Sequence, residues 1–181
     1  MKKNILIATN AQKILYFLIN HSIRDFLEIE IQKATKISKS GVNYALRDLI
    51  STDFLLRTKR GKTFFYTLNH KKPIVKQLKV IETIRQINGL LKKLKPLSSR
   101  IILFGSSGRG EDTEDSDIDL LIIGRNKDLL LEQIKKFKSK RKIQSIIYTN
   151  LNFIEKGKTD PVFYQQVNKG IVLWEGRSND L

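Results

Sequence analysis

Two short apolar runs on either side of a polar segment limit the fold of this chain more than any other feature. The first run covers residues 101–104 and the second covers residues 118–123, where one carboxylate interrupts it. Apolar runs of this length, next to glycine and polar turn residues, are typical of buried strands. The sequence therefore predicts two strands of a sheet, with the polar segment as the connection between them.

The two ends of the polar segment carry residues suited to a metal and to phosphate groups. Asp117 and Asp119 are two positions apart, and side chains alternate along a strand, so both carboxylates point to the same face. Their oxygen atoms can share one hard cation. At the other end, Gly105, Ser106 and Ser107 leave backbone amides and the Ser106 hydroxyl free to approach an anion. The expected ligand is a nucleoside triphosphate with a divalent metal.

This pattern resembles the signature of the DNA polymerase beta-like nucleotidyltransferases, and especially of their minimal branch. The shared features are a strand, a Gly-Ser turn, a spacer of about ten residues and an Asp-x-Asp pair within a hydrophobic strand. The resemblance implies that Gly105, Ser106 and Ser107 hold the nucleotide phosphates. It also implies that Asp117 and Asp119 are the catalytic acids and hold Mg2+ or Mn2+.

The resemblance extends from about residue 98 to the C-terminus, nearly half of the chain. Arg109 fits the basic position that often follows the turn in this family and would also bind the nucleotide. Residues 143–148 and 172–174 look like the next strand and the last one. A Gly-Ser turn alone is a common flexible turn, and the acidic segment alone is typical of a solvated loop. Their order between two apolar strands favours the family.

One position departs from the pattern of the active members. They carry a third acid on the following strand, where it activates the attacking hydroxyl, whereas this chain has Gln144 there. No Asp or Glu lies between Ile134 and Leu151 to replace it. Gln cannot accept a proton and is a weaker metal ligand than a carboxylate. Because phosphoryl transfer depends mainly on positioning and charge stabilisation, both a slow enzyme and a nucleotide-binding protein without catalysis remain open.

The basic charge of the chain lies almost entirely in its N-terminal half. The formal net charge is +16. Residues 1–96 hold 20 Lys and Arg against 6 Asp and Glu, while residues 97–181 hold 14 against 12. A domain this basic attracts a polyanion, and nucleic acid is the first candidate, ahead of an acidic membrane surface.

Hydrophobic spacing in the basic half predicts three helices and a hairpin. The first helix includes residues 14–18, the second covers residues 28–37, and the third runs over residues 38–51 with a serine as its N-cap. Residues 54–68 are expected to form two strands with a turn at residues 60–61. The order of helix, turn, helix and basic hairpin resembles the winged helix-turn-helix of transcription regulators.

In that family the third helix enters the major groove of DNA, and the hairpin touches the backbone or the minor groove. The third helix of this chain places polar side chains opposite its buried stripe, and the hairpin tip is basic. The alternatives are ordinary solvated charges or a module that contacts protein. The resemblance implies nucleic-acid contacts by Lys39, Ser40, Asn43, Arg47, Lys59, Arg60 and Lys62.

Residues 73–96 are expected to form a linker helix that starts at Pro73, a residue suited to the first helical turn, and ends before Pro96. Its apolar residues alternate spacings of four and three. This period suits either a partner helix across a two-fold axis, which would give a homodimer, or packing on the chain's own domains. The residues of this stripe are Val80, Ile84, Ile87, Leu91 and Leu94.

The expected fold class is therefore α+β. A winged helix-turn-helix at residues 1–72 precedes the linker helix at 73–96 and a nucleotidyltransferase fold with a mixed sheet at 97–181. A chain of 181 residues can hold two small domains of this kind. The absence of cysteine excludes disulfides and thiolate zinc sites, and no apolar run reaches membrane-spanning length. We expect a cytoplasmic protein without a membrane partner.

Two functions from different classes fit these expectations. In the first, the protein is a metal-dependent nucleotidyltransferase that transfers a nucleoside monophosphate to a hydroxyl of a protein or nucleic acid, and its winged helix binds DNA. The family resemblance suggests a small helical toxin-like protein as partner. In the second, the protein is a DNA-binding transcription regulator whose transferase-like domain senses a nucleotide and no longer catalyses. Gln144 favours the second function and the Asp-x-Asp pair favours the first.

Overall fold

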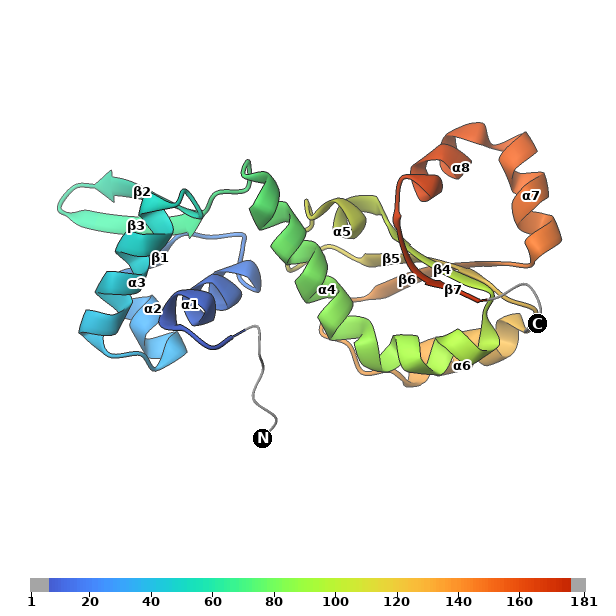
Figure 1. The fold of residues 1–181 in the computed structure, drawn as a ribbon, viewed down its shortest axis with the longest axis horizontal. Helices are drawn as coiled ribbons and strands as arrows, with labels where there is room; N and C mark the ends of the chain where they lie inside the picture. Colours follow the sequence, from blue (N-terminus) through green and yellow to red (C-terminus); the bar gives the residue numbers. More distant parts are fainter. Residues whose placement is uncertain (1–6, 177–181) are drawn as a thin grey trace. The chain divides into compact units, whose positions relative to one another are not determined.

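The computed structural model describes residues 7–176, so the first six and last five residues of the expected domains lie outside it. The chain divides into two compact units, residues 1–78 and residues 79–181. Helices, an antiparallel sheet and a mixed sheet confirm the α+β class (Figure 1). The division falls inside the long helix α4 (Pro73–Leu94), which starts at Pro73 as expected and ends two residues before Pro96.

The described part of the N-terminal unit contains the three expected helices and the expected hairpin (Figure 1). Its small sheet has the strand order β1-β3-β2, and both pairs are antiparallel. The two-residue strand β1 was not expected, because it is too short to show a hydrophobic period. The elements are α1 (Asn10–Ile19), β1 (Phe26–Leu27), α2 (Glu28–Thr35), α3 (Lys39–Ser51), β2 (Leu55–Arg60) and β3 (Thr63–Leu68).

Local chemistry fixes the ends of α3 and of the hairpin. The Ser38 hydroxyl accepts a hydrogen bond of 3.2 Å from the backbone amide of Gly41, which caps the start of α3 as expected. The hairpin turns at Gly61 and Lys62, one residue later than expected, with Gly61 at a φ of +59° that glycine adopts without strain. Apolar side chains of α1, α2, α3 and the sheet then form one core, which includes Ile14, Leu18, Phe26, Ile31, Val42, Leu46, Leu55 and Tyr66.

The C-terminal unit is built on a four-stranded mixed sheet in the order β6-β5-β4-β7. Strand β5 runs parallel to β6 and antiparallel to β4, which in turn is antiparallel to β7. The mixed sheet and the two later strands confirm the sequence predictions. The elements after α4 are η1 (Lys95–Leu97), β4 (Arg100–Phe104), α5 (Gly105–Arg109), β5 (Ile118–Ile123), α6 (Lys127–Lys136), β6 (Ile143–Tyr148), α7 (Asn150–Thr159), α8 (Pro161–Asn168) and β7 (Ile171–Glu175).

Both faces of this sheet are covered by helices (Figure 1). Leu120 and Ile122 of β5 pack in a core with residues of α4 and α6, while Leu121 and Ile123 point to the other face and pack against Phe153 of α7 and residues of α8. The sheet thus sorts alternate residues of β5 into two cores. Asp119, which is two positions before Leu121, belongs to the α7 and α8 face.

The apolar stripe of α4 belongs to the core of the C-terminal unit. Val80, Ile87, Leu91 and Leu94 are buried there, and Ile84 packs against them. Of the two alternatives for this stripe, packing within the chain is the one that the structure shows. The expected linker helix is therefore mostly part of the second unit.

No helix within residues 7–176 combines the length and the apolar character needed to cross a membrane.

Candidate functional site

The two acids of the Asp-x-Asp pair flank the first residue of β5. Asp117 directly precedes the strand, and Asp119 is its second residue, in register with Phe104 of β4. Both side chains are half-buried. Because residues 117, 119 and 121 alternate with the residues of the opposite core, the two carboxylates share the face of the sheet on which α7 and α8 lie.

The Gly-Ser turn lies directly against one of these acids. Gly105 follows Phe104 at the start of α5 and has a φ of +65°. A Cβ atom at this position would lie 2.2 Å from Oδ2 of Asp119, which is far inside van der Waals contact. Only glycine therefore allows the backbone of the turn and the Asp119 carboxylate to approach this closely.

Several charged side chains surround the Asp-x-Asp pair. Burial, and next the neighbouring carboxylate of Asp117, raises the pKa of Asp119, while Arg141 and Arg109 oppose this rise. The Nζ atom of the exposed Lys142 lies 3.6 Å from Oδ2 of Asp117. Two carboxylates held close together in a half-buried position repel each other, and a bound cation relieves that repulsion.

The donor set fits a magnesium ion that is completed by phosphate oxygens. Carboxylate oxygens are the ligands that Mg2+ prefers, and it is commonly bound by one or two carboxylates together with substrate phosphates. Within residues 7–176, no group of three or more His, Cys, Asp or Glu side chains lies close enough together to hold a metal. Asp117 and Asp119 are the two carboxylates that the acid pair offers to such an ion, and phosphate oxygens would supply further ligands.

Gln144 occupies the position beside Asp119 on the neighbouring strand. The two residues are partners in the parallel pair of β5 and β6, so their side chains share one face of the sheet. The Gln144 side chain is exposed. The register thus places an amide next to the acid pair at the point where the sequence pattern expected a third acid, and an amide does not take up a proton.

The other residues expected at the phosphates differ in how they are placed. Ser106 is half-buried, while the side chain of Ser107 is fully buried, and its hydroxyl donates a hydrogen bond of 3.1 Å to the carbonyl of Asp117. The Ser107 hydroxyl is therefore engaged in the interior, and only its backbone amide is available to a phosphate. Arg109 is exposed and forms an ion pair of 2.8 Å with Glu111.

A buried charged cluster behind the turn was missed by the sequence analysis. It consists of Lys79, Asp112 and Arg141, whose side chains are at most 8% exposed. Lys79 and Asp112 lie 33 positions apart in the chain, and Arg141 belongs to a basic run that is typical of a solvated surface. No local pattern brings these residues together, so the sequence offered no signal for the cluster.

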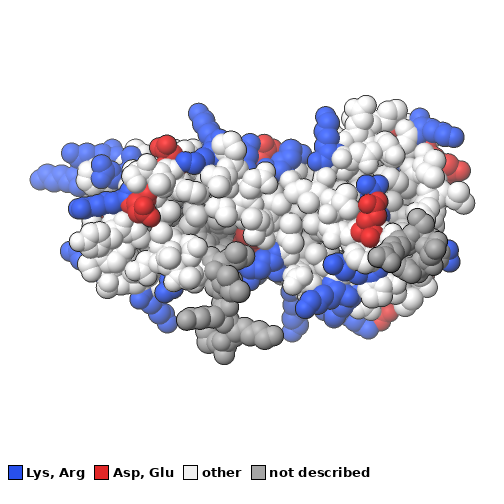
Figure 2. Space-filling model, viewed as in Figure 1, with Lys and Arg blue, Asp and Glu red and all other residues white. Residues whose placement is uncertain are grey.

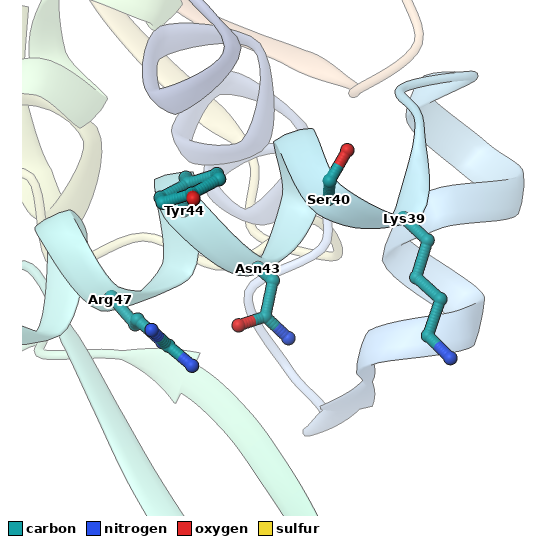
Figure 3. Close-up of a pocket in the computed structure, with 5 residues that line it drawn as sticks. All are labelled: Lys39, Ser40, Asn43, Tyr44 and Arg47. Atoms are coloured by element: carbon teal, nitrogen blue, oxygen red, sulfur yellow. The ribbon is translucent and has the colours of Figure 1, made fainter.

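A second candidate site lies on α3. Four of the residues expected to bind nucleic acid line a shallow pocket with a volume of about 580 Å³. The side chains of Lys39, Asn43 and Arg47 point to the same side of the helix (Figure 3). Tyr44 also lines this pocket and is 74% exposed, a residue that the sequence analysis did not include. The lining residues are Lys39, Ser40, Asn43, Tyr44 and Arg47.

The hairpin carries the remaining basic residues of this candidate interface. Lys59, Arg60 and Lys62 are exposed, and Lys and Arg gather over the hairpin end of the N-terminal unit (Figure 2). Arg60 also forms an ion pair with Asp25 and stacks on Phe65, with its guanidinium carbon 4.6 Å from the ring centre. Cation–aromatic stacking holds such side chains in place while their charge stays at the surface.

The C-terminal part of the chain is similar to known proteins. Residues 84–172 match the family model of the nucleotidyltransferase domain. A stretch of 38 residues, 21% of this chain, is 53% identical to "Putative protein adenylyltransferase MJ0604" of Methanocaldococcus jannaschii and spans 38% of the length of that protein.

Among solved structures, that of TrmBL2, an archaeal chromatin protein, aligns with 87% of this chain and 72% of its own. The identity is 13% and the TM-score is 0.30. The family match covers α4 from residue 84, the Gly-Ser turn, the acid pair and the sheet to β7. Residues 84–172 of this chain are thus similar to a nucleotidyltransferase domain.

Proposed function

We propose that the C-terminal unit binds a nucleoside triphosphate with Mg2+ and transfers the nucleoside monophosphate to a hydroxyl group of a protein. The observation that supports this most strongly is the approach of Gly105 to the Asp119 carboxylate, with Asp117 on the same face of the sheet. A phosphate chain and a metal need this combination of open backbone and paired acids in one place.

In this proposal the residues of the chain act mainly by positioning. The backbone of the turn and the Ser106 hydroxyl bind the phosphates, and Asp117 and Asp119 hold Mg2+ or Mn2+. A metal held by these two acids would neutralise phosphate charge and so stabilise the charge that develops during transfer. The acceptor oxygen attacks the α-phosphorus and forms a new bond to it. The bond between the α-phosphorus and the oxygen that bridges it to the β-phosphorus breaks, and pyrophosphate leaves. Gln144 does not take the hydroxyl proton, which passes to water or to a phosphate oxygen.

The relative from Methanocaldococcus jannaschii supports ATP as the donor and a protein as the acceptor, because its name describes it as a protein adenylyltransferase. This support comes from a match over 38 residues. A small helical toxin-like protein is the acceptor that the family resemblance suggests.

We further propose that the N-terminal unit is a winged helix-turn-helix that binds DNA. The excess of Lys and Arg in residues 1–96 and the common direction of Lys39, Asn43 and Arg47 on α3 support this role (Figure 3). In this arrangement α3 would read the major groove and the β2–β3 hairpin would contact the backbone. The protein would then recruit its transferase domain to DNA or regulate a gene.

A second candidate is a transcription regulator that senses a nucleotide without transferring it. The register of Gln144 beside Asp119 favours this function, since the strand neighbour that would supply a third acid carries an amide. An intact acid pair is useful in a sensor too, because Mg-nucleotide binding needs it.

One experiment separates the two candidates. The purified chain is incubated with Mg2+, each α-labelled nucleoside triphosphate and cell lysate, and the products are separated on a gel. Asp117→Asn/Asp119→Asn serves as the inactive control. Label transferred by the wild type alone supports the transferase, and the labelled band identifies the acceptor. No transfer, together with Mg2+-dependent nucleotide binding by calorimetry, supports the sensor, and the absence of both rejects the site.

A further inference from the structure

The Arg141 side chain donates five hydrogen bonds within the C-terminal unit. Arg141 lies two residues before β6, and its side chain is 8% exposed. Its Nε donates to the carbonyl of Ser116 at 2.7 Å, and its Nη2 donates to the carbonyl of Asp117 at 3.1 Å. Two consecutive carbonyl groups at the end of the acidic loop are thus held by one guanidinium.

The same guanidinium also fastens the Gly-Ser turn. Nη2 donates to the hydroxyl of Ser107 at 2.6 Å, and that hydroxyl donates onward to the carbonyl of Asp117 at 3.1 Å. Ser107 is on α5, two residues after Gly105, so a single buried network joins the turn to the acid pair. The spacing between the proposed phosphate-binding backbone and Asp117 therefore depends on Arg141.

Asp112 and Thr83 accept hydrogen bonds from Arg141 directly, and Lys79 in turn holds Asp112. Asp112 is buried, and its Oδ2 accepts from Nη1 of Arg141 at 2.5 Å. Lys79 of α4 donates to the carbonyl of Asp112, with its Nζ 3.7 Å from Oδ1 of the same residue. Burying three charges costs free energy that their attraction offsets only when the geometry is good. A cluster of this cost in the interior of a small unit calls for a function.

We propose that Arg141 is a positioning residue that holds Asp117 and the Gly-Ser turn at the spacing needed for a metal-bound nucleotide, and that Asp112 and Lys79 keep its guanidinium in place. This inference rests on the proposed function of the site. Arg141 touches neither the nucleotide nor the metal and acts through Ser107 and Asp117. The role needs the planar guanidinium with its five donors, because a lysine ammonium cannot reach acceptors on the loop, on α5 and on Asp112 in this geometry.

The test compares Arg141→Gln and Arg141→Lys with Arg100→Lys in the full chain. Arg100 is paired with Glu175 at 3.4 Å and lies at the end of β4 remote from Gly105, so its replacement makes the same chemical change away from the site. ATP affinity is measured by calorimetry with and without Mg2+. Thermal unfolding establishes that each variant is folded at the assay temperature, and amide hydrogen exchange is followed over residues 112–118.

Both Arg141 variants are expected to lose the Mg2+-dependent part of their ATP affinity by about 10- to 100-fold, as is typical when a residue that orients a metal ligand is removed. Their amides in the loop should exchange faster, while Arg100→Lys behaves as the wild type. Arg141→Lys keeps the buried positive charge and is the variant expected to remain folded if Arg141→Gln does not. A folded Arg141 variant with wild-type Mg2+-dependent affinity overturns the inference. A wild type without Mg2+-dependent ATP binding overturns the proposed function instead.

Discussion

Gly105 and Asp119 approach each other so closely that a single methyl group at Gly105 would lie 2.2 Å from the Asp119 carboxylate oxygen. The contact joins the turn at the end of β4 to the second residue of β5. It makes the glycine a requirement of the site and gives a direct way to test it.

Gly105→Ala is expected to weaken Mg-ATP binding by about tenfold or more, because the turn or the carboxylate must move. The control is Gly61→Ala in the hairpin, where φ is also positive (+59°) but no atom lies within 4 Å of the added methyl. Both variants carry about 1–2 kcal/mol of backbone strain, and only Gly105→Ala adds a clash. Calorimetry with ATP and Mg2+ measures the difference. Equal affinity of the two variants would show that the contact does not shape the site.

Asp119→Asn should stabilise the protein in metal-free buffer at pH 7. Burial and the Asp117 carboxylate raise the pKa of Asp119 above its ordinary value of 3.8. Between the ordinary and the raised pKa, the folded state binds more protons than the unfolded chain. The free energy of unfolding therefore falls as the pH rises through the raised pKa, and it stays lower above it.

Removing this charge should therefore raise the Tm, by about 2–4 °C for each kcal/mol gained. The gain should vanish well below pH 3.8, where the carboxyl is protonated in both states. Asp115→Asn, an exposed position of the same loop, is the control. A Tm at pH 7 that is unchanged or lower in Asp119→Asn contradicts the prediction. Addition of Mg2+ and ATP should raise the Tm of the wild type and not that of Asp119→Asn.

Gln144→Asp is expected to increase transfer, because it places a carboxylate beside Asp119 in the register of β5 and β6. General base catalysis typically contributes about 10²- to 10⁴-fold to a rate. Gln144→Asn has the same length as the aspartate but no proton acceptor and should not gain activity. Single-turnover measurement of label transfer gives both rates. An equal effect of the two variants would place the base elsewhere.

Lys39→Ala and Arg47→Ala should each weaken DNA binding and lower the slope of log affinity against log salt by about one, since each removes one phosphate contact. Both side chains point from the same side of α3 (Figure 3). Lys13→Ala, an exposed position on α1, is the control with the same loss of charge. Binding of a duplex oligonucleotide at several salt concentrations measures the slopes. Identical slopes for all three variants would show that Lys39 and Arg47 of α3 do not contact the DNA phosphates.

Much of the local structure could be predicted because it depends on near neighbours in the chain. The N-cap at Ser38, the long helix from Pro73 to Leu94 and the strand at 143–148 follow from capping chemistry and hydrophobic period. The acid pair and the Gly-Ser turn were also visible as a pattern of spacing. The contact between them could be expected only in outline, since it is fixed by the pairing of β4 with β5.

The parts that could not be predicted depend on contacts between distant positions. The buried cluster joins Lys79 of α4 to Asp112 in a loop and to Arg141 before β6, so no single stretch of sequence contains its signal. Strand β1 is two residues long and gains its structure only from pairing with β3. The engaged hydroxyl of Ser107 likewise follows from the position of Arg141.

The amide of Asn43 on α3 donates to both carboxylate oxygens of Glu28, at 3.2 and 3.3 Å. A negative side chain therefore contacts one residue of the surface proposed to meet DNA, and it repels any phosphate that comes near it. Such a residue lowers affinity for nucleic acid in general and penalises complexes in which the backbone is out of place. The proposed interface would then discriminate among DNA sites by rejecting wrong alignments as well as by attracting the right one.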